Sequence, residues 1–370
     1  MSSNTRSIQI GGFAHVNSIY IGGAYPVAVQ TMWKDRLAFA DLEGTKGEAL
    51  YGRIRRLEDL GCSILRFAVP NMEAAEILGR LAERVSMPIS ADIHFDYRIA
   101  LRCMDFPIAK IRINPGNIGG PDRIKMVLAK ASAKGVPLRI GVNGGSLPSD
   151  LRGRVDAGTL DRAEALVAAA ERETAVFRDF GFENFLVSMK ASSQAETVRA
   201  NRIFAGRNDI PLHIGVTEAG PLIAGVVRNA VALHALLEEG IGGTLRVSLS
   251  DTMENEVIAG REILGAAAES MGRGREDRGI VIISCPRCGR SCFDTHAFTE
   301  RWMSRLYSMK KNITVAVMGC AVNGPEEAKH ADLGITGAGG NAVIFRRGRV
   351  IRTIAGNEAD AAFAEELDRL

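Results

Sequence analysis

The sequence has few cysteines, no long apolar run and almost no net charge. Six cysteines in 370 residues are too few for a disulfide scaffold, and in a reducing compartment clustered thiols indicate a metal site or catalysis. No stretch of about 18 apolar residues occurs, and the first residues lack the apolar core of a signal peptide. We therefore expect a cytoplasmic protein without a membrane segment. A net charge of +3 gives no reason to expect nucleic acid or a membrane surface as a partner.

Short β-branched runs alternate with longer amphipathic stretches over the first two thirds of the chain. The predicted strands are 26–31, 63–68, 88–92, 109–113, 137–142, 184–189, 211–216 and 243–248. Helical patterns lie around 47–60, 71–85, 96–103, 121–134, 160–180, 193–206 and 219–239. Eight βα repeats over about 240 residues match the count and size of a TIM (β/α)8 barrel. A doubly wound open sheet is the alternative, but no G-x-G-x-x-G follows the first strand and the repeat spacing has no break.

A second, smaller α/β pattern follows the barrel. The polar Gly/Arg/Glu-rich stretch 271–278 predicts a linker between a barrel domain at 1–270 and a second domain at 279–370. Within the second domain we expect a strand at 279–284, a helix at 294–309 and a strand at 313–318. Short strands near 342–346 and 349–353 and a closing helix from about 357 complete the expected pattern.

Polar side chains stand at the C-terminal ends of the predicted barrel strands, where TIM barrels carry their catalytic groups. Five of them are the cations Arg66, Arg112, Arg139, Lys190 and Arg246. Buried cations are costly unless they meet anions, and arginine in particular forks onto phosphate oxygens. The pattern therefore predicts a phosphate or diphosphate site. The alternative is that some of these cations are rim charges or pair with Asp92 and Glu218.

Other groups at the same strand ends suggest further chemistry. The Gly-rich turn at 112–120, which includes Asn114, leads into a helix and offers backbone amides to an anion. Asp92 and His94 are candidates for metal ligands or acid/base groups, or for a structural hydrogen-bonded pair. Glu218, placed among cations, should stay ionised and is a candidate base or proton relay.

Three cysteine positions stand out in the second domain. Cys285 and Cys288 form a C-P-x-C pair at the end of a predicted strand, and Cys320 follows some thirty residues later. Thiolates select zinc or iron–sulfur clusters, and structural zinc usually has four ligands in two close pairs, so the residues favour iron–sulfur over zinc. They leave the fourth ligand open among Cys292, the default from spacing, and His296, His330, Glu326 and Glu327.

Several segments, taken in order, resemble the 4-hydroxy-3-methylbut-2-enyl diphosphate synthase family. They are RFAVP (66–70), ADIHFDYR (91–98), KIRINPGNIG (110–119), RIGVN (139–143), GVTEAG (215–220), RVSL (246–249) and both cysteine motifs. The resemblance covers nearly the whole chain. It is to the shorter bacterial form, a barrel followed directly by a cluster domain, in the methylerythritol phosphate route to isoprenoids.

The resemblance implies reductive ring opening and dehydroxylation of 2-C-methyl-D-erythritol 2,4-cyclodiphosphate. It implies a [4Fe-4S] cluster held by Cys285, Cys288, Cys320 and Glu327, with no need for a cysteine at position 292. The implied diphosphate contacts are Arg66, Arg112, Arg139, Asn143, Lys190, Arg246 and Ser248. The resemblance also implies that Glu218 takes part in proton transfer and that flavodoxin or ferredoxin is the electron donor. It further implies a homodimer in which the barrel of one subunit works with the cluster domain of its neighbour. The rival interpretations are a non-redox barrel lyase or transferase and a zinc-stabilised binding protein.

The chain departs from the family pattern at two places. The first strand runs into VQTMWKD (29–35) where the family commonly has V-Q-S-M-T-N-T. The contacts of that loop are therefore not carried over, and Trp33 or Lys34 are candidates to replace them. Glu326 stands where glycine is usual, which places a second carboxylate beside Glu327.

Overall fold

The computed structural model describes residues 5–273, 279–320 and 324–370, and the chain divides into two compact units, Met1–Ala267 and Ala268–Leu370. The predicted linker at 271–278 lies largely outside the described residues. Among the described residues, no helix combines the length and apolar character needed to cross a bilayer.

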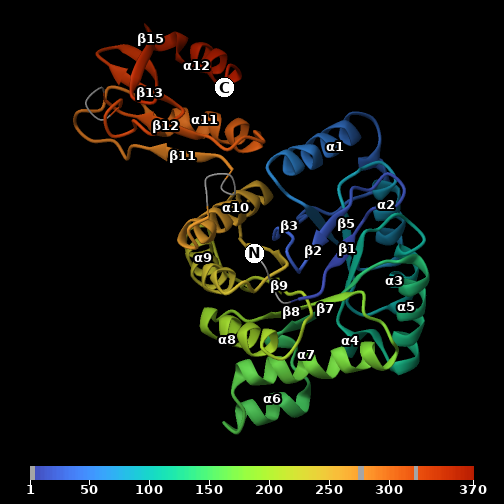
Figure 1. Ribbon diagram of the computed structural model, residues 1–370. Helices are drawn as coiled ribbons and strands as arrows, with labels where there is room; N and C mark the ends of the chain where they lie inside the picture. The colour runs from blue at the N-terminus through green and yellow to red at the C-terminus, as the bar shows by residue number, and fades with distance from the viewer. Residues whose placement is uncertain (1–4, 274–278, 321–323) are drawn as a thin grey trace. The chain divides into compact units, whose positions relative to one another are not determined.

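The first unit is a TIM barrel, as the strand spacing predicted (Figure 1). Its parallel strands are β3 (Ala28–Met32), β4 (Ile64–Ala68), β5 (Ile89–Asp92), β6 (Lys110–Ile113), β7 (Leu138–Asn143), β8 (Phe185–Lys190), β9 (His213–Ile214) and β10 (Thr244–Leu245). They are hydrogen-bonded in the order β8-β7-β6-β5-β4-β3-β10-β9. A bridge between Val187 and Leu212 joins β8 to β9 and closes the ring.

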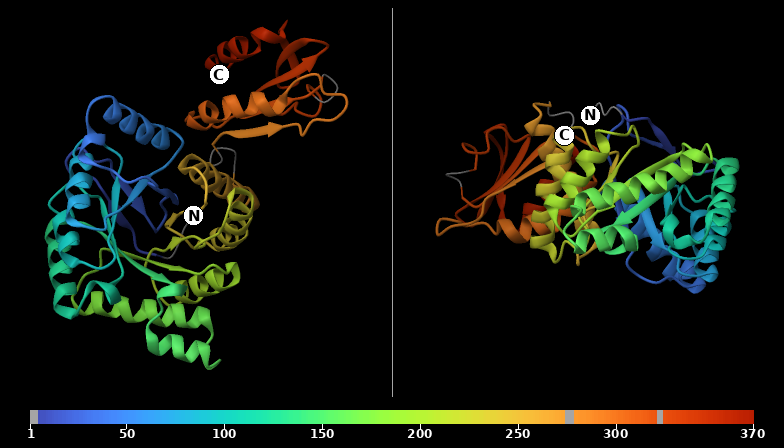
Figure 2. Two further views of the ribbon diagram at one scale, coloured as in Figure 1. Left: turned by 180° about the vertical axis from the view of Figure 1, so that it is seen from behind. Right: turned by 90° about the horizontal axis from the view of Figure 1, so that it is seen from below.

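Helices surround this barrel in both views of Figure 2. They are α1 (Gly44–Asp59), α2 (Met72–Ala82), α3 (Tyr97–Cys103), α4 (Pro115–Ile118), α5 (Pro121–Lys134), α6 (Ser149–Asp156), α7 (Arg162–Asp179), α8 (Gln194–Ala205), α9 (Leu222–Glu238) and α10 (Met253–Ser270), with 3-10 turns η1 (Phe39–Leu42) and η2 (Gly144–Ser146). Local sequence explains where several begin: the Asn71 side chain accepts a hydrogen bond from the backbone N–H of Ala74 and caps α2. Asp161 caps α7 in the same way.

An N-terminal hairpin, which the sequence did not predict, covers one end of the barrel. Strands β1 (Ile8–Ile10) and β2 (Ile19–Ile21) pair antiparallel. Ile8, Ile10 and Ile21 are buried in one apolar cluster with Ala28 and Ile64, which begin β3 and β4. The hairpin therefore closes the N-terminal end of the barrel and leaves the C-terminal end as the open mouth.

The second unit is a five-stranded mixed sheet. Strands β11 (Val281–Ser284), β12 (Thr314–Met318) and β13 (Leu333–Ala338) run parallel, while β14 (Asn341–Arg346) and β15 (Arg349–Ala355) continue antiparallel. Helices α11 (Thr295–Ser308) and α12 (Ala359–Asp368), the latter preceded by the 3-10 turn η4 (Gly356–Glu358), pack through the rings of Phe298, Trp302 and Phe363. The expected pattern lacked β13, the strand that joins the parallel and antiparallel halves.

Candidate functional site

The mouth of the barrel holds a polar cavity of about 360 Å³. The cavity is lined by Met32, Arg66, Asp92, His94, Arg112, Arg139, Asn143, Ser188, Lys190, Thr217, Glu218, Arg246 and Ser248. These residues include all five strand-end cations, the seven implied diphosphate contacts and Glu218. Parallel register explains the convergence, because Asp92, Arg112 and Arg139 are direct partners on β5, β6 and β7.

Asp92 is the anion that holds two of the arginines. Its Oδ1 lies 3.1 Å from Arg112 Nη1 and its Oδ2 lies 3.7 Å from Arg66 Nε. Burial alone would raise the pKa of Asp92, but Arg66, His94 and Arg112 outweigh it and hold the pKa far below the ordinary range. His94 Nε2 lies 2.9 Å from the same Arg112 Nη1. Asp92 Oδ2 lies 3.6 Å from His94 Nε2, and the interpretations of these two residues as metal ligands, acid/base groups or a structural pair stay predictions.

A second buried carboxylate, Glu256, was missed by the sequence analysis. Its side chain is fully buried, and its Oε1 lies 3.2 Å from Arg246 Nη2 and 3.1 Å from Lys34 Nζ. Thr31 Oγ1 donates to Oε2 at 2.6 Å. Burial raises the pKa of Glu256, but Arg246 and these hydrogen bonds leave it below its usual range. Glu256 lies in the first turn of α10, a helix absent from the predicted pattern, so no sequence signal pointed to it.

The divergent first loop contributes little to the cavity. Met32 is its one lining residue. Trp33 is buried against Phe67, with ring centroids 5.5 Å apart, and Lys34 reaches Glu256 instead. Neither Trp33 nor Lys34 lines the cavity, so the expectation that they replace the loop's usual contacts is not supported.

Arg139 differs from Arg66, Arg112 and Arg246 in making no ion pair with another described residue. It is 2% exposed, and its Nε and Nη1 have no hydrogen-bond partner within the described parts of the chain. Burial, followed by the nearby charges of Arg66 and Arg112, lowers its pKa well below the ordinary value. A buried guanidinium with unpaired N–H groups is costly, and it indicates that the cavity is built for an anion.

Glu218 stands at the exposed rim of this cavity. Its backbone has φ +53°, a left-handed conformation that costs energy in a residue with a Cβ and often marks a functional position. The neighbouring Thr217 N–H donates to the Ala191 carbonyl at 3.0 Å and fixes the turn. The Glu218 side chain is therefore exposed to solvent at the rim of the cavity that the cations line.

Asn114, also expected at the mouth, lines a different cavity. That cavity has a volume of about 370 Å³ and includes Arg152 and Glu173. Glu173 accepts a hydrogen bond from the Gly116 backbone, and burial raises its pKa. The amide of Gly116 in the Gly-rich turn is thus already bound by protein.

In the second unit, backbone pairing brings the cysteine segments together at the C-terminal ends of β11 and β12. The Cys285 N–H donates to Val317 O at 2.9 Å, and the Cys292 N–H donates to Gly319 O at 2.9 Å. Gly319 precedes Cys320, and a Cβ at Gly319 would lie 2.5 Å from Ser291 Oγ and 3.7 Å from Cys285 Sγ. Glycine at this position therefore lets the Ser291 side chain approach the end of β12, with the Cys285 thiol in ordinary contact distance.

The remaining proposed ligands differ in exposure. Cys288, Glu326 and Glu327 are exposed, whereas Cys320 is 7% exposed. Cys285 packs against an apolar cluster that includes Ala328, the residue after Glu327. No three His, Cys, Asp or Glu side chains among the described residues are arranged to hold a metal. The donor types, three thiols with the carboxylates of Glu326 and Glu327, still fit the soft-ligand chemistry of an iron–sulfur site.

Two of the other cysteines are buried, whereas Cys292 is exposed. Cys62 and Cys103 lie in the barrel core, and burial raises the pKa of each to about 12. His296 is exposed on α11, 3.6 Å from Glu300. The burial of Cys62 and Cys103 gives neither thiol a ligand role, and His296 stays one of the open alternatives for the fourth ligand.

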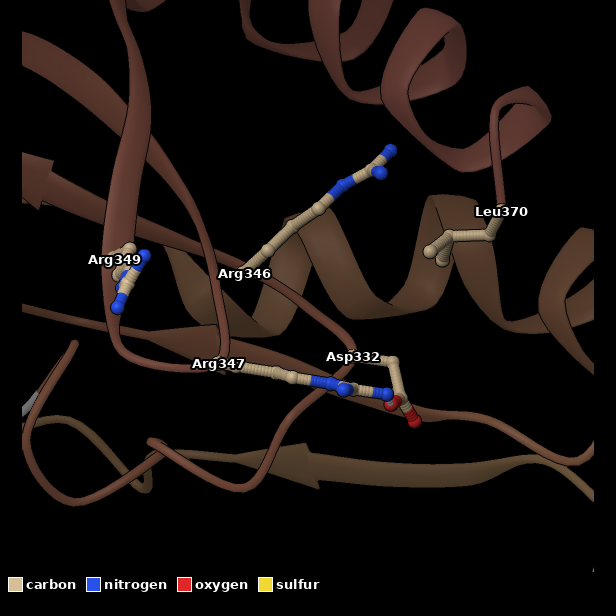
Figure 3. Close-up of a pocket in the computed structure, with 5 residues that line it drawn as sticks. All are labelled: Asp332, Arg346, Arg347, Arg349 and Leu370. Atoms are coloured by element: carbon tan, nitrogen blue, oxygen red, sulfur yellow. Dashed lines mark ion pairs between the residues drawn. The ribbon is translucent and has the colours of Figure 1, made fainter.

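A cavity of about 530 Å³ lies at the β14–β15 hairpin. Figure 3 shows the residues that line it, Asp332, Arg346, Arg347, Arg349 and Leu370. Arg347 Nη2 lies 3.6 Å from Asp332 Oδ1, and Arg346 Nη2 lies 3.2 Å from Glu366 Oε2. These pairs compensate two of its cations within the protein. No residue predicted from the sequence lies in this cavity.

The chain matches known proteins over nearly its full length. Residues 10–261 match the GcpE TIM-barrel domain and residues 281–369 match the GcpE protein C-terminal domain. The 4-hydroxy-3-methylbut-2-en-1-yl diphosphate synthase (flavodoxin) of Treponema pallidum is 51% identical over 99% of this chain and 92% of that protein. The enzyme of the same name from Treponema denticola is 49% identical, over 99% of this chain and 98% of that protein. That of Thermodesulfovibrio yellowstonii is 41% identical, over 98% of this chain and 98% of that protein.

Proposed function

This chain belongs to the GcpE family, and we propose that it acts as a 4-hydroxy-3-methylbut-2-en-1-yl diphosphate synthase, the activity for which its relatives are named. The reaction opens the ring of 2-C-methyl-D-erythritol 2,4-cyclodiphosphate, takes up two electrons and releases water. The observation that carries the proposal is the mouth cavity, where five cations surround about 360 Å³ and Arg139 has unpaired, buried N–H groups.

The cations of the cavity bind the diphosphate in this proposal. Arginine donates in a fork that matches phosphate oxygens, and Asp92 and Glu256 hold three of the four arginines in position before the ligand arrives. Such preorganisation reduces the cost of ordering side chains on binding. The proposed diphosphate contacts are Arg66, Arg112, Arg139, Asn143, Lys190, Arg246 and Ser248.

Glu218 is proposed to transfer the proton that allows a hydroxyl group to leave as water. Its carboxylate lies at the rim of the same cavity, where the substrate carbon skeleton would extend from a diphosphate bound among the cations. General acid–base catalysis of this kind needs a carboxyl group within hydrogen-bond reach of the leaving oxygen.

Cys285, Cys288, Cys320 and Glu327 are proposed to hold a [4Fe-4S] cluster, with Glu327 as the ligand most readily exchanged because oxygen binds iron less tightly than thiolate. When bound, the cluster supplies the electrons one at a time, and flavodoxin or ferredoxin delivers them. The proposal includes the homodimer implied by the family resemblance and a cytoplasmic location, because the free thiols need a reducing compartment.

The decisive experiment is anaerobic turnover of the cyclodiphosphate by the full chain, reconstituted with iron and sulfide and supplied with a reduced one-electron donor. We expect 4-hydroxy-3-methylbut-2-enyl diphosphate as the product, with about four irons and acid-labile sulfide per chain. One zinc per chain and no turnover would instead support the binding-protein rival. Mixing Lys190→Met with Cys320→Ser subunits tests the dimer, since shared sites regain activity in the mixture.

A further inference from the structure

A hydrogen-bonded chain of buried polar groups extends from the mouth cavity into the barrel. Lys190 Nζ lies 3.0 Å from His213 Nε2, and His213 Nδ1 lies 2.7 Å from Thr244 Oγ1. His213 and Thr244 are fully buried, and Lys190 is 6% exposed. Of the three, only Lys190 lines the cavity. These hydrogen bonds therefore connect Lys190, a proposed ligand contact, to the buried side chains of His213 and Thr244, which no ligand in the cavity reaches.

The backbone makes room for Lys190 in this position. Gly215 follows β9 directly, and a Cβ at Gly215 would lie 2.5 Å from the Arg246 carbonyl oxygen and 2.7 Å from Lys190 Nζ, both closer than real Cβ contacts allow. The glycine of the His-Ile-Gly segment thus lets the lysine cross over the end of β9. Lys190 is held between this glycine and His213 rather than extending freely into the cavity.

The charges around Lys190 are predominantly positive. The charged groups that face Lys190 are Arg139 on β7, Arg66 on β4, Arg246 after β10 and Arg112 on β6. Lys110 is a further cation near His213. The carboxylates Asp92 and Glu256 contact the arginines. No ion pair to Lys190 occurs within the described residues. Burial, followed by these cations, lowers the pKa of Lys190 well below its ordinary value.

Lys190 is the cation of this cavity that can most readily release a proton. Arginine keeps its charge in proteins because its ordinary pKa exceeds 12, whereas buried lysines do become neutral. Burial, followed by the nearby charge of Lys190, also lowers the pKa of His213. A bound anion favours the charged form of Lys190, because an opposite charge raises the pKa of an amine.

His213 and Thr244 can satisfy both forms of the lysine. A charged Lys190 donates to His213 Nε2 while Nδ1–H donates to Thr244 Oγ1. A neutral Lys190 accepts from Nε2–H while the Thr244 hydroxyl donates to Nδ1, because imidazole and hydroxyl each donate or accept. A change of tautomer therefore keeps the buried groups bonded in both states, which avoids the cost of an unpaired buried group.

We propose that diphosphate binding at the barrel mouth is coupled to the uptake of one proton by Lys190, with His213 as the positioning residue that bonds to the amine before binding and to the ammonium after it. The net change is one proton taken from solvent: an N–H bond forms at Lys190 Nζ, and in His213 an Nδ1–H bond replaces the Nε2–H bond. This inference rests on the proposed function, because it takes the cyclodiphosphate as the ligand.

Calorimetric titration of the full, cluster-loaded chain with the cyclodiphosphate tests the coupling, without a reductant so that no turnover occurs. The titration is repeated at one weakly alkaline pH in buffers of different ionisation enthalpy, which gives the number of protons exchanged. The ligand's phosphodiester groups do not titrate near neutrality, so an exchanged proton belongs to the protein. We expect uptake of about one proton per site.

Two variants assign the proton to Lys190. Lys190→Arg keeps the charge permanently, so binding should persist while uptake falls close to zero. Lys190→Met should also abolish uptake and weaken binding roughly 10- to 100-fold, the loss typical of a hydrogen bond to a charged group. Uptake that persists in both variants would overturn the assignment to Lys190.

Further variants test the role of His213. His213→Leu should weaken binding, and His213→Gln, which offers both an acceptor and a donor, should restore much of the affinity and of the uptake. Wild-type affinity and uptake in His213→Leu would overturn the positioning role. Gln30→Leu is the matched control: Gln30 accepts from buried Lys110 at 2.7 Å and does not line the cavity, so it should cost stability without changing uptake.

Failure of the inference is distinguishable from failure of the proposed function. If the wild-type chain does not bind the cyclodiphosphate at all, the proposed function is wrong. If it binds and turns over the compound with no proton uptake, only the coupling is wrong.

Discussion

Glu256→Gln tests whether the buried carboxylate on α10 stabilises the cationic mouth. The substitution keeps the shape of the side chain and removes its charge. Arg246 Nη2 would lose a charged oxygen at 3.2 Å, and Lys34 Nζ would lose the same charged oxygen at 3.1 Å. Arg246 is 15% exposed and Lys34 is 30% exposed, so solvent compensates Lys34 more than Arg246.

The expected loss follows from these contacts. Removing one partner of a buried ion pair costs about 3 to 5 kcal/mol. We take the lower end, about 3 kcal/mol, because Lys34 reaches solvent. For a domain of this size, that loss lowers the melting temperature by roughly 6 to 12 °C.

Thermal unfolding followed by circular dichroism measures the shift, with Glu164→Gln as control. Glu164 pairs with Arg199 at 3.3 Å on the exposed face of α7, so its loss should change the melting temperature little. A Glu256→Gln shift no larger than that of the control would refute the reasoning.

The pH dependence of this difference has a definite sign. The pKa of Glu256 is lowered in the folded protein, so the wild-type carboxylate stabilises the fold above its unfolded pKa of about 4.3. That contribution disappears as the pH falls through the folded pKa. The wild-type and Glu256→Gln proteins should therefore converge in stability in strong acid, and a difference that grows on acidification would contradict this account.

Three further substitutions test the proposed roles of individual groups. Arg139→Met should raise the melting temperature, because it removes a buried cation with unpaired N–H groups, and should weaken cyclodiphosphate binding roughly 10- to 100-fold; calorimetry checks both. Cys320→Ser should abolish the visible absorption of the reconstituted cluster, whereas Cys292→Ser should keep it. Glu218→Gln should lower the turnover rate by about 100-fold or more while leaving binding nearly unchanged, as steady-state kinetics would show.

The barrel was predictable because its signal is local and repeated. Each predicted strand was a short β-branched run, and eight of them at regular spacing left few other architectures. The observed strands β9 and β10 are only two residues long, yet both lie within the predicted segments. The β1–β2 hairpin was missed because its three-residue strands are too short for a periodic pattern.

The cationic mouth was predictable for a related reason. In a TIM barrel the C-terminal ends of all strands meet at one face, so residues such as Arg66 and Arg246 could be assigned to one site once the fold was recognised. Of the carboxylates that compensate them, Asp92 was named from the sequence, whereas Glu256 could not be assigned. Thr31 and Glu256 are 225 positions apart, and nothing in either segment indicates the other.

The sequence by itself determined the fold class, the set of cations at the mouth and the cysteine motifs, because these depend on periodicity and on residue type. The tertiary structure decided which groups are buried together: Asp92 with two arginines, Glu256 with Arg246, and Lys190 with His213. Burial and neighbouring charge set the free energy of an ionisable group, and both depend on contacts between segments far apart in the chain. The charge state of the proposed site is therefore a property of the folded barrel.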